Sequence, residues 1–361
     1  MSQVEAVDVF SVAVPTPQTL SNSQKQFTEY HFVIARVRTA LAEGWGWAYT
    51  QGVAGDLVGR LASSLLQPAV IGREPSHTNL IWRDWAAAAY SIGMTGLFRL
   101  GCAALDIALW DVLAREQGKS LTDLLGGAVK TAVPGYFSHL NLLQEDEAMV
   151  EEATAARQQG FRQWKMKVGR TMAEDVGRIR RVKELGLEVM VDANQKFLRD
   201  EAVRRALAYR DAGAWFLEEP VSATDWDGYR TLASLGLLTI AGGESLYQPE
   251  WFDILDTTGV QVWQPDIFRV GGITPLLPLL HKAAGRHQSV MLHCGEELAT
   301  PIAMAFDIVR MVEHLPAIGL YELGLVDQRL AWQDGLAVPL AGPGHGVRFA
   351  EDRLREFRQL G

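Results

Sequence analysis

Three acidic residues recur at an even interval in the second half of the chain, and each follows a short apolar stretch. Asp192 lies in VMVDANQ, Glu218 in WFLEEP and Glu244 in TIAGGES, so each acid stands 26 positions after the one before. That interval is the length of one strand and one helix. In a barrel of β/α units, the carboxyl ends of the strands meet at one mouth. The spacing therefore predicts a parallel barrel with clustered acids at its rim.

Short apolar segments alternate with amphipathic ones from Val133 onward, as expected for such a barrel. The predicted strands are Val133–Ser138, Gln163–Val168, Glu188–Val191, Trp215–Leu217, Leu238–Ala241, Val260–Gln264, Ser289–Leu292 and Ile318–Tyr321. Helical patterns lie between them, such as Ala148–Gln159, Met172–Leu185 and Asp200–Ala212. We therefore expect a (β/α)8 TIM-type barrel over residues 128–330. A doubly wound open sheet is the alternative, but no Gly-rich phosphate turn follows the first strand.

The first part of the chain has a different pattern, and we expect residues 1–127 to form an α+β capping domain. Predicted strands at Val4–Val14, Tyr30–Thr39 and Gly44–Ala48 suggest an antiparallel meander, and Arg99–Gln117 has helical periodicity. The polar segment Pro15–Phe27 reads as a loop, either a flap or an ordinary surface loop. Residues 331–361 are expected to return to the capping domain and complete it.

Composition excludes several classes of protein. The net charge is −9 and no basic run exceeds Arg180-Arg181, which argues against nucleic acid as a partner. The two cysteines, Cys102 and Cys294, have no CxxC spacing, so we expect neither a disulfide framework nor a thiolate metal site. This usage fits a cytoplasmic location. The N-terminus has no secretory pattern, and no apolar stretch reaches the roughly 18 residues of a membrane span.

Three carboxylates at one barrel mouth would repel one another unless a cation neutralised them. Oxygen ligands alone favour Mg2+, with Mn2+ as a possible substitute. Asp192, Glu218 and Glu244 are therefore candidate metal ligands. The alternative is that they are ordinary surface acids or partners in salt bridges.

Two lysines end the strand before the first acid. Lys165 and Lys167 are two positions apart, so both side chains face the same side of a strand. Two neighbouring ammonium groups lower each other's pKa, and partial burial lowers it further. We therefore expect a lysine able to act as a general base. The alternative is a pair of solvated lysines.

Asp266 and His293 end the two strands after Glu244. A carboxylate beside an imidazole fixes its tautomer and raises its basicity, so His293 could transfer a proton opposite Lys167. A buried structural pair is the alternative. Glu322, in GLYELG, ends the eighth predicted strand and is a candidate general acid or orienting group. Weaker candidates for contact with a substrate are Ser138, Asn194 and Lys25.

These residues resemble the enolase superfamily, specifically its mandelate racemase subgroup. The segments that carry the resemblance are GLFRLGCAALDIALWD, LTDLLGG, WKMKVG, VMVDANQ, FLEEP, GGES and WQPDIFRVGGIT, in that order along the chain. The resemblance implies that the three acids bind Mg2+ and that Lys167, tuned by Lys165, is a base on one face of the substrate. His293, paired with Asp266, would serve the opposite face. Glu322 matches the subgroup's acid near the end of strand eight.

The resemblance also implies a small-molecule carboxylate substrate that loses its α-proton to form an ene-diolate. We expect dehydration of an acid sugar to a 2-keto-3-deoxy acid, and a homo-oligomeric protein. Racemisation or epimerisation of a 2-hydroxy acid and cycloisomerisation of a sugar-acid lactone are the alternatives. A barrel kept for binding alone would show a broken acid series, which is not seen. Lys-x-Lys and a single cluster of acids argue against an unrelated metal-dependent hydrolase.

Overall fold

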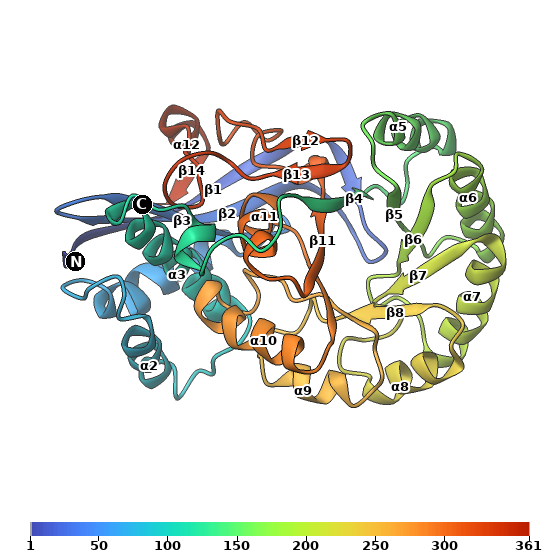
Figure 1. Ribbon diagram of the computed structural model, residues 1–361, viewed down its shortest axis with the longest axis horizontal. Coiled ribbons are helices and arrows are strands. Elements are labelled where there is room, and N and C mark those ends of the chain that lie inside the picture. Colours follow the sequence, from blue (N-terminus) through green and yellow to red (C-terminus); the bar gives the residue numbers. More distant parts are fainter. Residues whose placement is uncertain (1, 361) are drawn as a thin grey trace.

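A four-stranded antiparallel sheet forms the core of the N-terminal part of the computed structural model, which describes residues 2–360 (Figure 1). Its order is β14-β1-β2-β3, so the last strand of the chain pairs with the first. The strands are β1 (Val4–Ser21), β2 (Gln26–Thr39), β3 (Glu43–Thr50) and β14 (Arg358–Leu360). The helical segments of this part are α1 (Gly55–Leu61), η1 (Ala62–Leu66), η2 (Gln67–Ala69), α2 (Thr78–Ala88) and α3 (Leu97–Glu116).

Helix α3 packs directly against β3, and two glycines make the close approach possible. A Cβ atom on Gly44 would lie 2.3 Å from the backbone nitrogen of Val112, and one on Gly46 would lie 2.2 Å from the carbonyl oxygen of Ala104. Any larger residue would force the sheet and the helix apart. The predicted helix at Arg99–Gln117 is confirmed within two residues at each end.

The segment Pro15–Phe27 is not the loop that its polar composition suggests. β1 continues to Ser21 and β2 begins at Gln26, so most of the segment is a β-hairpin, with a register shift between Pro15 and Leu20. Leu20 and Ser21 pair with Phe27 and Gln26 across the hairpin, which composition alone does not reveal. Only residues 22–25 form the tip.

The second part is a closed barrel of eight parallel strands surrounded by helices (Figure 1). Pairing of β11 with β4 closes the ring, with Val312 opposite Gly135. The strands are β4 (Val133–His139), β5 (Gln163–Lys167), β6 (Glu188–Asp192), β7 (Ala214–Glu218), β8 (Thr239–Gly242), β9 (Val262–Trp263), β10 (Ser289–Leu292) and β11 (Val309–His314). The helices are α5 (Asp146–Gln158), α6 (Met172–Glu184), α7 (Arg199–Ala212), α8 (Trp226–Leu235), α9 (Trp251–Asp256), α10 (Ile273–Gly285) and α11 (Glu296–Ala305). The expected (β/α)8 barrel with a capping domain is confirmed.

Seven of the eight predicted barrel strands overlap the observed ones, and the eighth prediction is wrong. Ile318–Tyr321 begins at the last residue of the 3-10 helix η3 (Pro316–Ile318) and runs into the turn that follows it, whereas the eighth strand is β11. The sequence VRMVEH carries three charged or titratable side chains in six residues, which hid this strand from a search for apolar segments. The acid at the end of the eighth strand is therefore Glu313 and not Glu322.

The barrel interior has an apolar layer beneath a polar one. A separate small core contains Tyr136, Met190, Phe216, Ala241, Val262 and Met291, with Met311 packed against it. Because side chains alternate across a strand, the residue two positions later faces the same interior, one layer nearer the mouth. On five strands these residues are Ser138, Asp192, Glu218, His293 and Glu313. The apolar layer thus closes the floor of the polar site.

The remaining elements connect the two parts. α4 (Leu121–Leu124) precedes the barrel, β12 (Ala331–Gln333) and β13 (Leu336–Val338) extend the barrel sheet beside β4, and α12 (Glu351–Phe357) leads to β14. No helix among residues 2–360 combines the length and the apolar character needed to cross a membrane.

One buried carboxylate joins the capping domain to the barrel. Asp106 of α3 accepts hydrogen bonds from Trp82 Nε1 at 2.8 Å and from the backbone nitrogen of Thr274, in the first turn of α10, at 2.9 Å. The carboxylate therefore caps a barrel helix from the other domain. Burial raises the pKa of Asp106 to about 6, although these hydrogen bonds oppose the shift.

Candidate active site

The polar residues predicted at successive strand ends converge at the carboxyl end of the barrel. They are almost fully buried beneath the capping domain, with relative exposures of 6% or less. Asp192 lies beside Lys167 on β5 and beside Glu218 on β7 in the strand register. The residues brought together are Lys165, Lys167, Asp192, Glu218, Glu244, Asp266 and His293.

Three carboxylates form a compact cluster in this site. One oxygen from each of Asp192, Glu218 and Glu244 lies within 4.8 Å of the others, and all three residues are buried. A donor set of oxygens alone, with this spacing and negative charge, fits Mg2+ or Mn2+. Burial raises the pKa of Glu218 well above its ordinary range. Burial also opposes ionisation of Glu244, but His293 and Arg269 outweigh it and lower that pKa.

Each lysine is held by carboxylates from neighbouring strands. Lys165 Nζ lies 2.8 Å from Glu218 Oε1, and Lys167 Nζ pairs with Asp192. Burial lowers the pKa of both lysines, but the surrounding acids, led by Glu218 for Lys165 and by Asp192 for Lys167, together raise it by more, so both pKa values lie above their ordinary range. The expected lowering is therefore wrong, because the sequence argument left out the acids across the strands.

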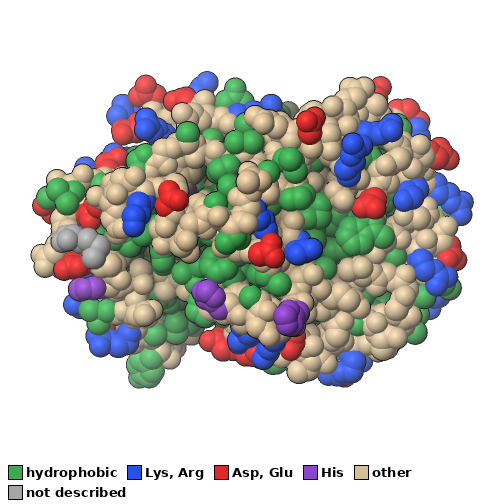
Figure 2. Space-filling view, viewed as in Figure 1, with side chains coloured by type: hydrophobic (Ala, Val, Ile, Leu, Met, Phe, Trp, Pro, Cys, Tyr) green, Lys and Arg blue, Asp and Glu red, His purple; other side chains and the backbone are tan. Residues whose placement is uncertain are grey.

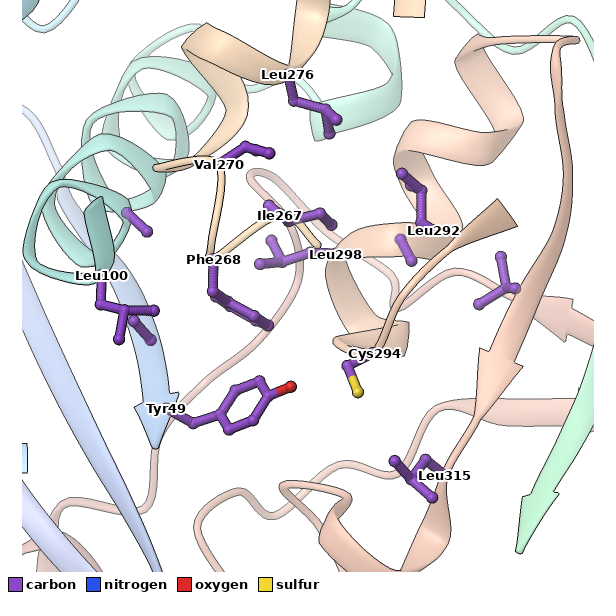
Figure 3. Close-up of a cluster of buried hydrophobic side chains, with 14 of the residues drawn as sticks. Tyr49, Leu100, Ile267, Phe268, Val270, Leu276, Leu292, Cys294, Leu298 and Leu315 are labelled. Atoms are coloured by element: carbon purple, nitrogen blue, oxygen red, sulfur yellow. The ribbon is translucent and has the colours of Figure 1, made fainter. Parts of the chain in front are cut away.

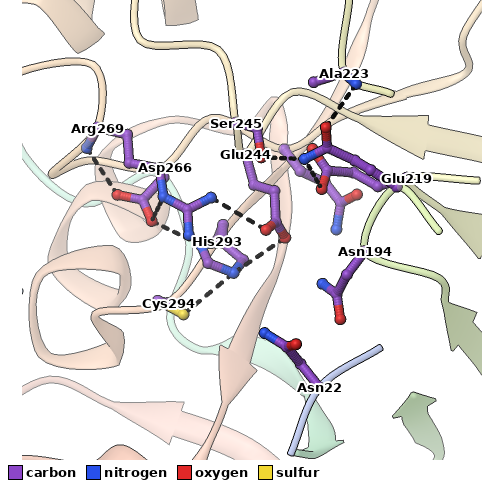
Figure 4. A network of polar contacts seen from close by, with 12 residues as sticks. Asn22, Asn194, Glu219, Ala223, Glu244, Ser245, Asp266, Arg269, His293 and Cys294 are labelled. Atoms are coloured by element: carbon purple, nitrogen blue, oxygen red, sulfur yellow. Dashed lines mark hydrogen bonds and ion pairs between the residues drawn. The ribbon is translucent and has the colours of Figure 1, made fainter. Parts of the chain in front are cut away.

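His293 is oriented by Asp266. His293 Nδ1 lies 2.7 Å from Asp266 Oδ2, whose other oxygen accepts hydrogen bonds from the backbone nitrogens of Phe268 and Arg269. This leaves His293 Nε2 facing the site, 3.1 Å from Glu244 Oε2 (Figure 4). Burial lowers the pKa of His293, but the fields of Cys294 and Glu244 and the bond to Asp266 raise it well above its ordinary range.

Sequence reasoning missed two charged residues of the site. Glu313 Oε1 lies 2.7 Å from Lys165 Nζ, and its Oε2 accepts a hydrogen bond from the backbone nitrogen of Cys294 at 2.9 Å. Burial opposes its ionisation, but Lys165 and His293 lower its pKa to about 2. Arg269 NH1 lies 3.1 Å from Glu244, and its Nε lies 3.7 Å from Asp266. Figure 4 shows this guanidinium between the two acids.

Glu322 is not part of this cluster. It lies in the turn after η3, where it pairs with Arg329 at 2.9 Å and its side chain is 24% exposed. The alternation Met311-x-Glu313 within VRMVEH was the signal that pointed to the correct acid, because both side chains face the barrel interior.

The hairpin tip covers the mouth of the barrel. Ser23 Oγ donates to the carbonyl oxygen of Val168 at 2.6 Å, and Gln24 Nε2 donates to that of Asn194 at 2.6 Å. Lys196 Nζ returns a hydrogen bond to the carbonyl oxygen of Ser23 at 2.9 Å. The capping domain is thereby fastened to the loops that follow β5 and β6.

A polar cavity of about 260 Å³ lies beneath this tip, next to the acid cluster. It adjoins a second cavity of about 320 Å³, and Lys25, Gln51, Tyr247 and Arg269 line both. The first is lined by Asn22, Gln24, Lys25, Gln51, Asn194, Gln195, Glu219, Glu244, Ser245, Tyr247 and Arg269. Amide, hydroxyl and charged groups therefore dominate the wall nearest the candidate metal ligands.

The three weaker candidates occupy different positions. Lys25 is exposed at the edge of the cavity, and its Nζ donates to the carbonyl oxygen of Gln51 at 3.0 Å. Asn194 lines the cavity and donates to both oxygens of Asp192, through its backbone nitrogen at 2.8 Å and Nδ2 at 3.1 Å. Ser138 is buried at the end of β4, and within residues 2–360 its hydroxyl has no hydrogen-bond partner.

A closed β/α barrel under an α+β cap, with acids, lysines and a His–Asp pair at the strand ends, defines an enzyme of the enolase type. Two family models match this chain. The "Enolase C-terminal domain-like" model covers residues 148–353, and the "Mandelate racemase / muconate lactonizing enzyme, N-terminal domain" model covers residues 5–126. The chain belongs to the mandelate racemase/muconate lactonizing enzyme family.

Its relatives catalyse different reactions. The chain is 29% identical to the L-talarate/galactarate dehydratase of Salmonella typhimurium over 96% of its own length and 87% of that protein. It is 28% identical to the 3,6-anhydro-alpha-L-galactonate cycloisomerase of Streptomyces coelicolor, covering 96% of each. The crystal structure of a racemase from Streptomyces coelicolor with bound magnesium superposes with a TM-score of 0.93 at 26% identity, covering 99% of this chain and 100% of that one.

Proposed function

We propose that this protein removes the α-proton of a carboxylate substrate in a Mg2+-dependent reaction and dehydrates an acid sugar, an aldonate or aldarate, to a 2-keto-3-deoxy acid. One observation carries the proposal. A cluster of three buried carboxylates lies between a lysine on β5 and a histidine–aspartate pair on β9 and β10.

Asp192, Glu218 and Glu244 would hold the Mg2+ ion. When bound, the ion supplies positive charge that stabilises the second negative charge developing on a substrate carboxylate during loss of its α-proton. Lys165, Lys167 and Arg269 now balance the charge of the acids, which is consistent with a site built for a cation.

Lys167 is the proposed base for the α-proton. Lys167 can accept a proton only as a neutral amine, whereas its ion pair with Asp192 favours the protonated ammonium form. If Asp192 held a divalent cation, its carboxylate would bind the Lys167 ammonium group less strongly and so would favour the neutral amine. Lys165 stays fixed between Glu218 and Glu313, so its charge lowers the pKa of Lys167.

His293 is the proposed acid on the other side. Its raised pKa keeps the imidazole protonated near neutral pH, and Nε2 faces the site. In dehydration the α-proton passes to Lys167, the C–O bond to the β-hydroxyl breaks, and His293 gives that oxygen a proton so that it leaves as water. The resulting enol then tautomerises to the 2-keto-3-deoxy acid. Proton transfer by a positioned side chain contributes roughly 10²–10⁴-fold to the rate.

The lining of the cavity supports a polyhydroxylated substrate, since amide and hydroxyl groups there match sugar hydroxyls. A second candidate function is racemisation or epimerisation at the α-carbon. It is favoured by the presence of two proton-transfer groups, Lys167 and His293, because one can remove a proton and the other return one on the opposite face. Cycloisomerisation of a sugar-acid lactone is the third candidate, on the strength of the cycloisomerase relative.

The test is a screen of the purified protein with Mg2+ against aldonates and aldarates, reading formation of 2-keto-3-deoxy acid, with parallel 1H NMR in D2O. Keto acid establishes the dehydratase and identifies the sugar. Deuterium uptake at the α-carbon without keto acid would replace dehydration by racemisation. Silence in both assays, together with Mg2+ binding that Glu218→Gln does not alter, would overturn the proposal.

Three further proposals concern the protein as a whole. We propose domain boundaries near residues 127 and 330, a cytoplasmic location and a homo-oligomeric state with a small carboxylate as its ligand. The two free buried cysteines suit a reducing compartment. On the face seen in Figure 2, basic side chains are interspersed with acidic ones instead of forming one block, which suits a protein that binds no nucleic acid.

A further inference from the structure

A second group of potential metal ligands lies beside the three carboxylates, and it differs from them in chemistry. It comprises His293, Cys294 and Glu313, whose ligand atoms all lie within 4.8 Å of one another. Cys294 Sγ is 3.3 Å from His293 Nε2, and Glu313 Oε2 is 4.0 Å from the same nitrogen. All three residues are buried.

These separations suit a tetrahedral zinc ion. With Zn–N and Zn–O bonds of about 2.1 Å and a Zn–S bond of about 2.3 Å, tetrahedral angles put nitrogen and oxygen about 3.4 Å apart and nitrogen and sulfur about 3.6 Å apart. The observed separations are 3.3 Å for nitrogen and sulfur and 4.0 Å for nitrogen and oxygen, so each differs from these values by about 0.6 Å or less.

The surroundings of His293 match those of a zinc ligand. A metal-bound histidine usually gives its other ring N–H to a carboxylate, which fixes the tautomer and directs the remaining nitrogen at the ion. His293 Nδ1 has this partner in Asp266, at 2.7 Å. The backbone nitrogen of Cys294 holds Glu313 Oε2 at 2.9 Å, so the third candidate ligand is positioned as well.

A small cavity lies next to two of these three residues. Its volume of about 30 Å³ exceeds the roughly 10–15 Å³ that a water molecule needs, and Cys294 and Glu313 line it. Glu296 and Glu297 also line it, and no lysine or arginine does. Figure 3 shows the Cys294 sulfur on the side of the apolar cluster that faces the hydroxyl of Tyr49. The cavity provides space for a fourth ligand next to Cys294 and Glu313.

We propose that His293, Cys294 and Glu313 form a binding site for a thiophilic divalent cation, Zn2+, distinct from the three-carboxylate site. Binding requires the thiol proton of Cys294 and the Nε2 proton of His293 to pass to solvent, so that the thiolate and the freed lone pair of Nε2 bind the ion. It also ends the contact of that nitrogen with Glu244, so the two sites share an edge. Zn2+ would therefore withdraw His293 from proton transfer and inhibit the enzyme.

Donor type separates the two sites. Carboxylate oxygens alone suit Mg2+, whereas a set of sulfur, nitrogen and oxygen selects zinc and its neighbours in the transition series. Sequence analysis did not predict a thiolate site, because the two cysteines have no CxxC spacing. Parallel pairing of β10 with β11 supplies Glu313 beside the adjacent His-Cys pair.

The first experiment adds Co2+, a spectroscopic substitute for Zn2+, to the full-length protein in saturating Mg2+. We expect a near-ultraviolet thiolate-to-cobalt charge-transfer band in the wild type and in Cys102→Ala, which retains Cys294 as its single thiol. Cys294→Ser and Cys294→Ala should lack the band. Absence of the band in the wild type, or its persistence in both Cys294 variants, overturns the proposal.

The second experiment titrates Zn2+ by calorimetry, again in saturating Mg2+. We expect one Zn2+ equivalent in the wild type, weakened at least about tenfold in Cys294→Ser, and an unchanged Mg2+ isotherm that reports intact folding of the variant. Zn2+ that displaces Mg2+ equally well from wild type and variant would instead place it in the three-carboxylate site and overturn the proposal. The outcome does not depend on which substrate the enzyme uses.

Discussion

Removing the charge of Glu313 tests the corrected assignment of the eighth strand. Glu313→Gln keeps the shape of the side chain but removes its ion pair with Lys165, a residue with no exposed surface. Two unit charges 2.7 Å apart attract by about 6 kcal/mol at an effective dielectric constant of 20. Desolvation offsets part of this attraction, and breaking one side of a buried pair typically costs about 3–5 kcal/mol.

Glutamine still accepts a hydrogen bond from Lys165, and Glu218 remains 2.8 Å from that ammonium group. We therefore expect the lower end of the range, a loss of about 3 kcal/mol in the free energy of unfolding. The matched control is Glu322→Gln. Its partner Arg329 is 55% exposed, so the control should change stability by no more than about 1 kcal/mol.

Reversible guanidinium unfolding, followed by circular dichroism, measures both variants against the wild type under the same buffer conditions. The midpoint and the slope together give the free energy. Equal stability of the two variants would refute the argument that Glu313, and not Glu322, is the buried acid that balances Lys165.

Four other outcomes are expected. Lys167→Ala should reduce α-proton exchange from substrates of one stereochemical series by roughly 10²–10⁴-fold, and His293→Asn should do so for the other series. Exchange of both series at wild-type rates would exclude Lys167 and His293 as the proton-transfer groups. Glu218→Gln should weaken Mg2+ binding, and an unchanged Mg2+ titration of this variant would exclude Glu218 as a ligand. The wild type should gain about 2.7 kcal/mol in its free energy of unfolding when Mg2+ is at 100 times its Kd, and EDTA should reverse this gain. Lys25→Met should change the ranking of substrates in the acid-sugar screen, while Lys119→Met, an exposed control, should not; identical rankings would make Lys25 a bystander. The pKa of Asp106 is raised to about 6, so its protonated form stabilises the fold by about 3 kcal/mol below about pH 4, and this contribution is lost as the pH rises through 6. Asp106→Asn should lack that part of the pH dependence when denaturation is measured across this range. Parallel curves of stability against pH for the variant and the wild type would contradict the raised pKa.

Local pattern was sufficient wherever one strand or helix carried its own signal. The repeat that ends in Asp192, Glu218 and Glu244 identified three barrel strands and placed the acids at one mouth, since a strand's end and its side-chain alternation depend on nearby residues. Lys165 and Lys167 were likewise assigned to one side of β5, and both are buried in the site.

Prediction failed where a residue depends on a partner from another part of the chain. Glu313 was missed because its cation, Lys165, lies on β5, six strands earlier in the chain, and the two residues meet only when the barrel closes. The hairpin looked like a loop because its polar side chains dock on loops of the barrel, as Ser23 does on Val168.

The sequence by itself determined the class of fold, the positions of seven site residues and the kind of metal that three carboxylates would hold. Tertiary structure decided the charge states, because Asp192 and the other acids across the strands raise the pKa of Lys167 by more than burial and the nearby Lys165 lower it. It also decided which acid completes the site and that a histidine, a cysteine and a glutamate share one corner of it. Electrostatic interactions depend on distance and burial, and closure of the barrel sets both.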